Sequence, residues 1–205
     1  MLQQGQWRLR NGEHRQGALF SCMDGVVCLS ADLWMRFYYN LALCDVKSLA
    51  GPNEYFPAAT AEGSKLRGVM FRARIAVVDH CSEVLGLLGH LGCLKHPGER
   101  DVQVRDIEQS LRIIAEWPFV REHGIILPGL WMVKPEESRF GFVSEAFELR
   151  SGTVSQIPSD AVEEVNVRVR QILDFIDRVR EVPSEHLPHL GTPTPSGEPR
   201  RAASR

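Results

Sequence analysis

The sequence predicts a mainly α-helical protein with a minor β component, folded as an antiparallel helical bundle. The first observation is that apolar residues recur at steps of three and four, the spacing of a buried helix face, in several long segments. The predicted helices cover residues 31–46, 65–95, 101–117 and 159–182. The second observation is an Asn-Gly and an Asp-Gly dipeptide near the N-terminus, which are typical of tight hairpin turns. Contacts between consecutive helices favour the antiparallel arrangement.

The N-terminal region is predicted to form a β-hairpin. Its clearest turn is Asp24-Gly25, because apolar arms at residues 18–23 and 26–29 flank this dipeptide. Ser30 then offers an N-cap oxygen to the first predicted helix. That helix carries large apolar side chains and is expected to be buried.

Segment 65–95 is apolar on most of its circumference, which predicts a central core helix. One stripe of this helix is polar and consists of Arg72, Asp79, Glu83 and His90. Near its end, glycine recurs at every third position, at Gly86, Gly89 and Gly92. Each glycine costs about 1 kcal/mol relative to alanine inside a helix. The glycines indicate either close packing against another helix or fraying, and the leucines around them favour packing.

The predicted helix 101–117 is expected to end at Pro118, which cannot continue a helix. The segment 119–157 is irregular and contains the minor β component. Short strands are expected on both sides of Pro128-Gly129 and of Ser151-Gly152. Residues 139–149 fit a short helix as an alternative.

The predicted helix 159–182 is the best defined, because Asp160 and Glu163 resemble a capping box at its start. Its apolar seam consists of Val162, Val165, Val169, Ile172, Ile176 and Val179. Such a β-branched seam is typical of helix–helix interfaces and predicts packing within a bundle, with self-association where part of it stays exposed. Residues 1–182 are therefore predicted to form one helical domain, and residues 183–205 a disordered, proline-rich tail.

Composition and charge exclude several classes of protein. The chain has 205 residues, of which 43% are hydrophobic, so it has enough apolar material for a core. A formal net charge of −2 gives no general attraction for nucleic acid, which is not expected as a partner. The sequence contains no segment long and apolar enough for a membrane span, and its N-terminus lacks the apolar core of a signal peptide. No membrane partner is therefore expected, and a cytoplasmic location is predicted.

The five cysteines predict neither a zinc ribbon nor a redox pair, because no two of them have Cys-x-x-Cys spacing. They are Cys22, Cys28, Cys44, Cys81 and Cys93. Free thiols in a reducing compartment are the expected state. No cofactor is predicted.

The polar stripe of the predicted helix 65–95 supplies the candidate metal ligands. Asp79 and Glu83 lie one turn apart, His90 follows two turns later, and His80 lies beside the stripe. Two carboxylates at this spacing could share a proton or bind a metal ion. The alternative is a solvated helix face, which is the more common role of such a stripe.

Arg74 and His80 are the candidate catalytic residues. Their Arg-x5-His spacing resembles the Arg-x4–6-His pair of the HEPN ribonucleases, in which both residues act on an RNA phosphate. The resemblance implies a helical ribonuclease. The sequence departs from the HEPN pattern at Ile75, where those enzymes usually carry a polar residue.

The leading functional hypothesis is a non-catalytic interaction or accessory protein with a protein partner or a tendency to self-associate. It rests on the lack of a recognisable catalytic motif and on the large apolar surface of the predicted helices. The alternatives are a metal-binding helical bundle and a HEPN-like ribonuclease. Whether the protein is an enzyme is left open by the sequence.

Overall fold

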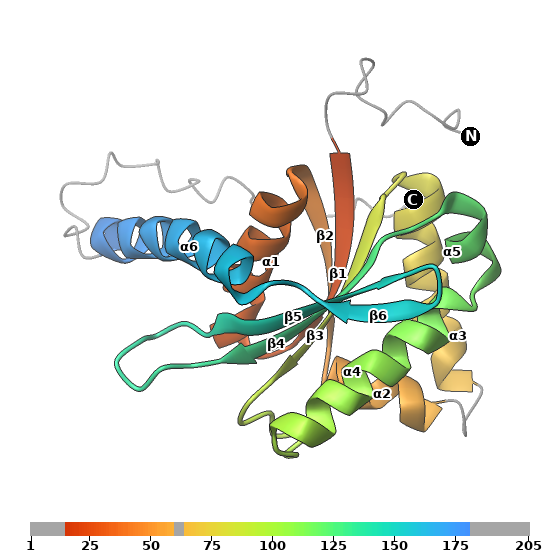
Figure 1. Ribbon diagram of the computed structural model, residues 1–205, viewed down its shortest axis with the longest axis horizontal. Coiled ribbons are helices and arrows are strands. Elements are labelled where there is room, and N and C mark those ends of the chain that lie inside the picture. The colour runs from red at the N-terminus through yellow and green to blue at the C-terminus, as the bar shows by residue number, and fades with distance from the viewer. Residues whose placement is uncertain (1–14, 60–63, 181–205) are drawn as a thin grey trace, which may run out of the picture.

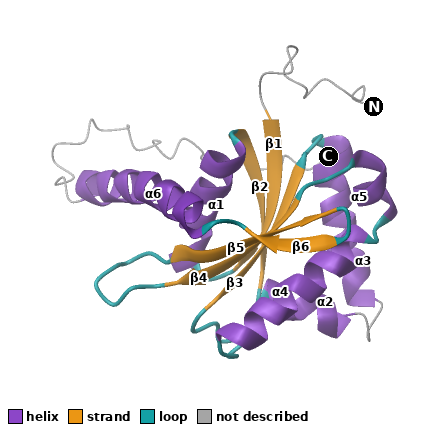
Figure 2. Ribbon diagram, viewed as in Figure 1, coloured by secondary structure: helices purple, strands orange, loops and turns teal. Residues whose placement is uncertain are grey.

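The computed structural model describes residues 15–59 and 64–180, which form an α/β structure built on one sheet (Figure 1). The sheet is mixed and has six strands in the order β2-β1-β3-β4-β5-β6. Helices cover both of its faces (Figure 2). The predicted helical bundle is therefore wrong, because several segments with helix-like spacing are buried strands.

Four strands run parallel to one another, and two further strands, each paired antiparallel with the strand before it, complete the sheet. The parallel strands are β1 (Arg15–Cys22), β2 (Leu41–Leu49), β3 (Val84–His90) and β4 (Leu127–Val133). The antiparallel strands are β5 (Phe142–Arg150) and β6 (Thr153–Gln156). β1 and β3 lie inside the sheet and are largely buried on both faces, so neither shows the apolar–polar alternation of a half-buried strand.

The helices divide between the two faces and form a separate hydrophobic core on each. The first face carries α1 (Gly25–Tyr39) and α6 (Ser159–Arg180). The second face carries α2 (Pro52–Ala59), α3 (Ser64–Arg74), the π-helix η1 (Ile75–Asp79), α4 (Arg100–Ala115) and α5 (Pro118–His123). No helix of the described part of the chain is long and apolar enough to cross a membrane.

The predicted N-terminal hairpin is replaced by the junction between β1 and α1. The side chain of Asp24 accepts a hydrogen bond from the Val26 amide at 2.9 Å, so Asp24 caps a helix instead of forming a hairpin turn. α1 ends at Asn40, which adopts a left-handed conformation with φ 51°. The helix therefore begins earlier than the predicted range 31–46, and residues 41–46 of that range belong to β2.

The predicted helix 65–95 is divided among α3, η1 and β3. Gly86 and Gly89 mark close packing, but of helices against a strand, whereas Gly92 has open space around it and instead takes a positive φ. A Cβ atom on Gly86 would lie 2.8 Å from Met35 Cε of α1, and one on Gly89 would lie 2.8 Å from Asn53 Nδ2 of α2. A side chain at either position would separate β3 from the helix that covers it.

The other predicted elements agree more closely with the structure. The predictions of helices at 101–117 and 159–182 are confirmed by α4 and α6. Ser151-Gly152 forms the turn between β5 and β6, as predicted. Pro128-Gly129, in contrast, lies inside β4 and makes no turn. The tail, residues 183–205, lies outside the described residues, and the domain limits 1–182 stay a prediction.

Candidate metal centre

Two parallel neighbouring strands place a cysteine and a histidine at the same edge of the sheet. Cys22 is the last residue of β1, and His90 is the last residue of β3. From β1 the chain moves to β2 on one side, and it later returns to β3 and β4 on the other side. The carboxyl ends of strands at such a reversal leave a crevice in which open α/β sheets usually hold their ligands.

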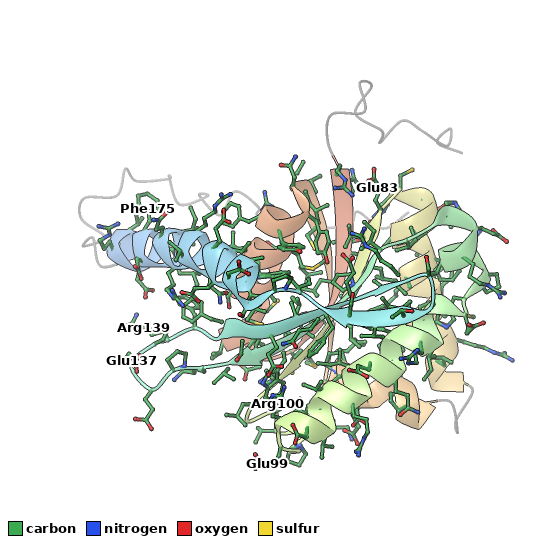
Figure 3. The ribbon with its side chains drawn as sticks, in the orientation of Figure 1. Glu83, Glu99, Arg100, Glu137, Arg139 and Phe175 are labelled. Atoms are coloured by element: carbon green, nitrogen blue, oxygen red, sulfur yellow. The ribbon has the colours of Figure 1, made fainter. Side chains whose placement is uncertain are left out.

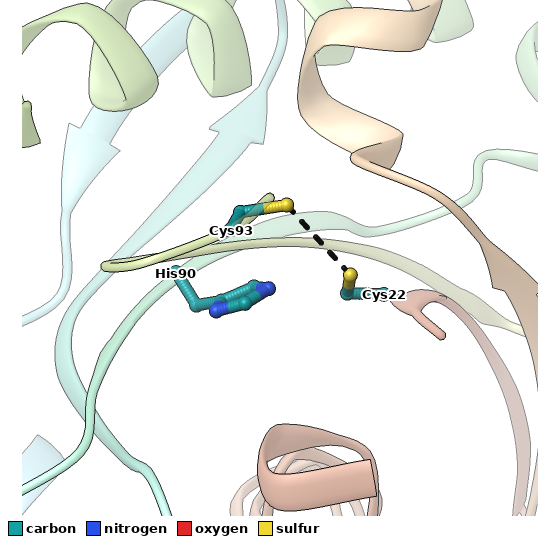
Figure 4. Close-up of side chains that lie close together, drawn as sticks. All are labelled: Cys22, His90 and Cys93. Carbon is teal, nitrogen blue, oxygen red and sulfur yellow. Dashed lines mark hydrogen bonds between the residues drawn. The ribbon is translucent and has the colours of Figure 1, made fainter. Parts of the chain in front are cut away.

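Cys93 completes a cluster of three potential metal ligands with Cys22 and His90 (Figure 4). The two Sγ atoms lie 3.8 Å apart, and the potential ligand atoms of the three residues lie within 4.8 Å of one another. Gly92, with φ 78°, reverses the chain after β3 and so brings Cys93 back toward His90. All three residues are buried.

The imidazole of His90 is oriented for ligation through one nitrogen. Its Nδ1 lies 3.1 Å from the Leu91 carbonyl oxygen, to which it donates a hydrogen bond. Its Nε2 is buried and lacks a hydrogen-bond partner among the described residues. Burial lowers the pKa of His90, which favours the neutral ring. A neutral ring with a fixed Nδ1–H presents the Nε2 lone pair to a metal ion.

The cluster fits a soft divalent metal ion. Burial raises the pKa of the Cys93 thiol, so the thiolate needs a nearby positive charge. A buried nitrogen without a partner is also costly, and a metal ion at this place would satisfy both groups. Two cysteine sulfurs and one histidine nitrogen are a donor set that zinc favours. Three protein ligands leave a fourth position for a reactant, which is typical of catalytic sites.

Asp24 lies beside the cluster and fixes the chain directly after Cys22. Its carboxylate is engaged by the Val26 amide at the start of α1, and its negative charge opposes the fall of the His90 pKa. The potential ligand Cys22 is therefore held between the end of an inner strand and the capped start of a helix.

Most of the candidate ligands predicted from the sequence lie elsewhere. Asp79 ends η1, while His80 Nδ1 lies 3.1 Å from Asp45 Oδ2 of β2. Glu83 Oε2 accepts a hydrogen bond of 2.8 Å from Arg15 Nε of β1. Only His90 of the predicted group belongs to the cluster.

The candidate catalytic pair Arg74 and His80 also lies outside the cluster. Arg74 is the last residue of α3, and His80 follows η1. Both side chains are exposed. The two residues therefore belong to different elements and not to the single long helix that the sequence predicted.

Sequence reasoning missed Cys22 and Cys93, which were expected to be free thiols. The cysteines lack Cys-x-x-Cys spacing, which is the cysteine pattern that most directly indicates a metal site. The available signal was His90-x-x-Cys93, because a histidine and a cysteine three residues apart are able to bind one metal ion. The position of Cys22 became clear only from the pairing of β1 with β3.

Comparison with known families assigns the chain to one of them. Residues 12–135, more than half of the chain, match the model of a family described as "Putative carbonic anhydrase". The chain belongs to this family. The matched region contains all three residues of the metal cluster. Membership in a carbonic anhydrase family overturns both the predicted non-catalytic accessory role and the HEPN-like ribonuclease.

Solved structures of β-carbonic anhydrases are also similar to this member of the carbonic anhydrase family. One is from a pair of tetrameric enzymes of the filamentous ascomycete Sordaria macrospora, at 11% identity and a TM-score of 0.38, covering 73% of this chain and 84% of the other. A second is from the fungal pathogen Aspergillus fumigatus, at 15% identity and a TM-score of 0.35, with coverages of 79% and 86%. No curated protein matches the sequence.

Proposed function

We propose that the protein is a zinc-dependent carbonic anhydrase that hydrates carbon dioxide to bicarbonate. The observation that carries the proposal is the convergence of Cys22, His90 and Cys93 at the carboxyl ends of β1 and β3. Membership in the carbonic anhydrase family supports carbon dioxide as the substrate. The proposal replaces the expectation that the protein uses no cofactor.

The three ligands would hold zinc from two sides of the crevice. Cys22 would bind from the end of β1, while His90 and Cys93 would bind from the end of β3 and the loop after it. The hydrogen bond from His90 Nδ1 to the Leu91 carbonyl fixes the ring, so that Nε2 is available. In a three-ligand site, zinc supplies the activation of water as a nucleophile near neutral pH.

The test of the proposed function is the metal dependence of carbon dioxide hydration. Protein purified without an affinity tag is expected to contain one zinc per chain and to accelerate hydration in a stopped-flow assay with a pH indicator. A chelator should reduce the rate to that of the buffer, and one equivalent of zinc should restore it. Protein that holds zinc in this cluster but hydrates carbon dioxide no faster than buffer would contradict the proposed activity.

We also propose that the protein self-associates through α6. Val162, Val165 and Val169 of the predicted seam are buried against the first face of the sheet. Ile172 and Val179 of the same seam stay exposed toward the C-terminal end of α6 and, with Phe175, form an apolar row on the outer side of the helix (Figure 3). The row consists of Ile172, Phe175 and Val179. Two copies of this row would cover each other in a symmetric contact.

The predicted consequence is that Phe175→Glu reduces the oligomeric state, because Phe175 is 58% exposed and central to the row. A charge there would have to be buried in the contact, which is costly. Light scattering across micromolar concentrations measures the mass. Val167→Glu is the matched control, because Val167 is also exposed on α6 but lies off the row. A wild-type monomer at all concentrations would contradict self-association.

A further inference from the structure

The buried side-chain amide of Gln103 makes several hydrogen bonds close to the metal cluster. Gln103 lies on α4, and its side chain contacts the loop that connects β3 to α4 and is 0% exposed. A buried amide is costly unless its donors and acceptor are paired. The hydrogen-bond partners of Gln103 show which segment of the chain this side chain holds in place.

Four of the hydrogen bonds of Gln103 go to the main chain of the loop that carries the metal ligands. Oε1 accepts a hydrogen bond from the His90 amide at 3.2 Å. Nε2 donates to the carbonyl oxygens of His90 at 2.9 Å, His96 at 2.8 Å and Gly98 at 3.0 Å. Two amide hydrogens are therefore shared among three carbonyls. Gln103 holds both peptide groups of His90 and the far end of the loop.

The same network connects the loop to α2. Gln103 Oε1 also accepts a hydrogen bond from Asn53 Nδ2 at 3.1 Å. Separately from this network, Ser110 Oγ, further along α4, donates to the Asn53 carbonyl at 2.9 Å and so joins α4 to α2 without touching the loop. His96 and Asp106 form a second contact between loop and helix, with 2.9 Å between Nε2 and Oδ2. The loop is thus attached to α4 at both ends.

We propose that Gln103 is a positioning residue for the metal centre, which acts by holding the main chain of His90 and of the loop through Cys93. The inference rests on the proposed function, because it assumes that the cluster binds a metal ion. The conformation of this main-chain segment determines both the direction of the His90 ring and the position of Cys93. Groups that orient ligands in this way typically change metal affinity about 10–100-fold when they are removed.

The test compares zinc affinity, measured by competition with a chelator, between wild type and two variants. Gln103→Glu keeps the acceptor for the His90 amide but places a carboxylate against three carbonyl oxygens. Gln103→Met keeps the length of the side chain and removes all its strong hydrogen bonds. Both are expected to weaken zinc binding about 10–100-fold. The visible absorption of the cobalt-substituted protein should also change, because it reports ligand geometry and not stability.

Ser110→Ala is the matched control. Ser110 is equally buried on α4 and bonds to Asn53 and Asp106, but not to the loop. Its loss should lower stability and leave zinc affinity and the cobalt spectrum unchanged. Wild-type affinity and spectrum in both folded Gln103 variants would overturn the inference.

One outcome separates this inference from the proposed function. A wild type that binds zinc but does not hydrate carbon dioxide contradicts the activity alone, while weakened binding in the variants still supports the role of Gln103. A wild type without metal affinity overturns both. Should the variants fail to fold, hydrogen exchange in the wild-type apoprotein decides: a protected His90 amide supports the inference, and rapid exchange overturns it.

Discussion

Replacing Cys22 by serine is expected to abolish tight zinc binding and the carbon dioxide hydration that depends on it. A thiolate is a much better zinc ligand than a hydroxyl, which stays protonated at neutral pH. Because Cys22 would be a direct ligand, the loss of affinity should exceed the about 10–100-fold effect of removing an outer partner. Chelator competition and metal analysis of the purified variant measure it.

Cys28→Ser is the control for this substitution. Cys28 lies nearby on α1 and is partly buried, but it does not belong to the cluster. Its replacement should leave zinc affinity and hydration unchanged. Equal zinc affinity in Cys22→Ser and wild type would show that the metal binds elsewhere, and would remove the cluster from the proposed site.

Among the substitutions considered, Trp34→Ala is expected to lower the free energy of unfolding most, by about 3–5 kcal/mol. Trp34 is 0% exposed and belongs to the core between α1 and the sheet. Its ring stacks on Tyr38 at 4.8 Å between centroids and meets Tyr39 edge-on at 6.5 Å. The substitution removes these contacts and leaves a cavity. Urea unfolding of the apoprotein measures the change.

Leu94→Ala is the control for the loss of an apolar side chain. Leu94 is 100% exposed, so its truncation should change stability by no more than about 0.5 kcal/mol. A loss for Trp34→Ala as small as that of Leu94→Ala would contradict the packing of α1 on the sheet.

The fold was predictable where helices are amphipathic and exposed on one side. α4 and α6 agree with their predicted ranges for this reason. The central strands were not predictable from their period, because β1 and β3 are buried on both faces and lack alternation. In β3, leucines and glycines at steps of three and four fitted a helix equally well. Only its pairing with β1 and β4 decides its structure.

The candidate site was less predictable than the fold, because strand pairing brings its residues together. His90 was identified, but for its supposed place on a helix face that does not exist. Cys22 and Cys93 have no distinguishing neighbours in the sequence apart from the His90-x-x-Cys93 spacing. Gln103 resembled an ordinary polar residue of an amphipathic helix, and its role follows from the loop that folds over it.

Cys22 and Cys93 lie 71 positions apart in the sequence, and they are separated by α1, β2, α2, α3, η1 and β3. The unfolded chain holds no preformed site, so zinc would bind chiefly to the folded state. At a free zinc concentration of 100 times Kd, this binding would stabilise the folded state by about 2.7 kcal/mol. Molecules made during metal shortage would unfold more often and be degraded sooner, because proteases act on opened chains. The cellular amount of the protein would then follow the supply of zinc.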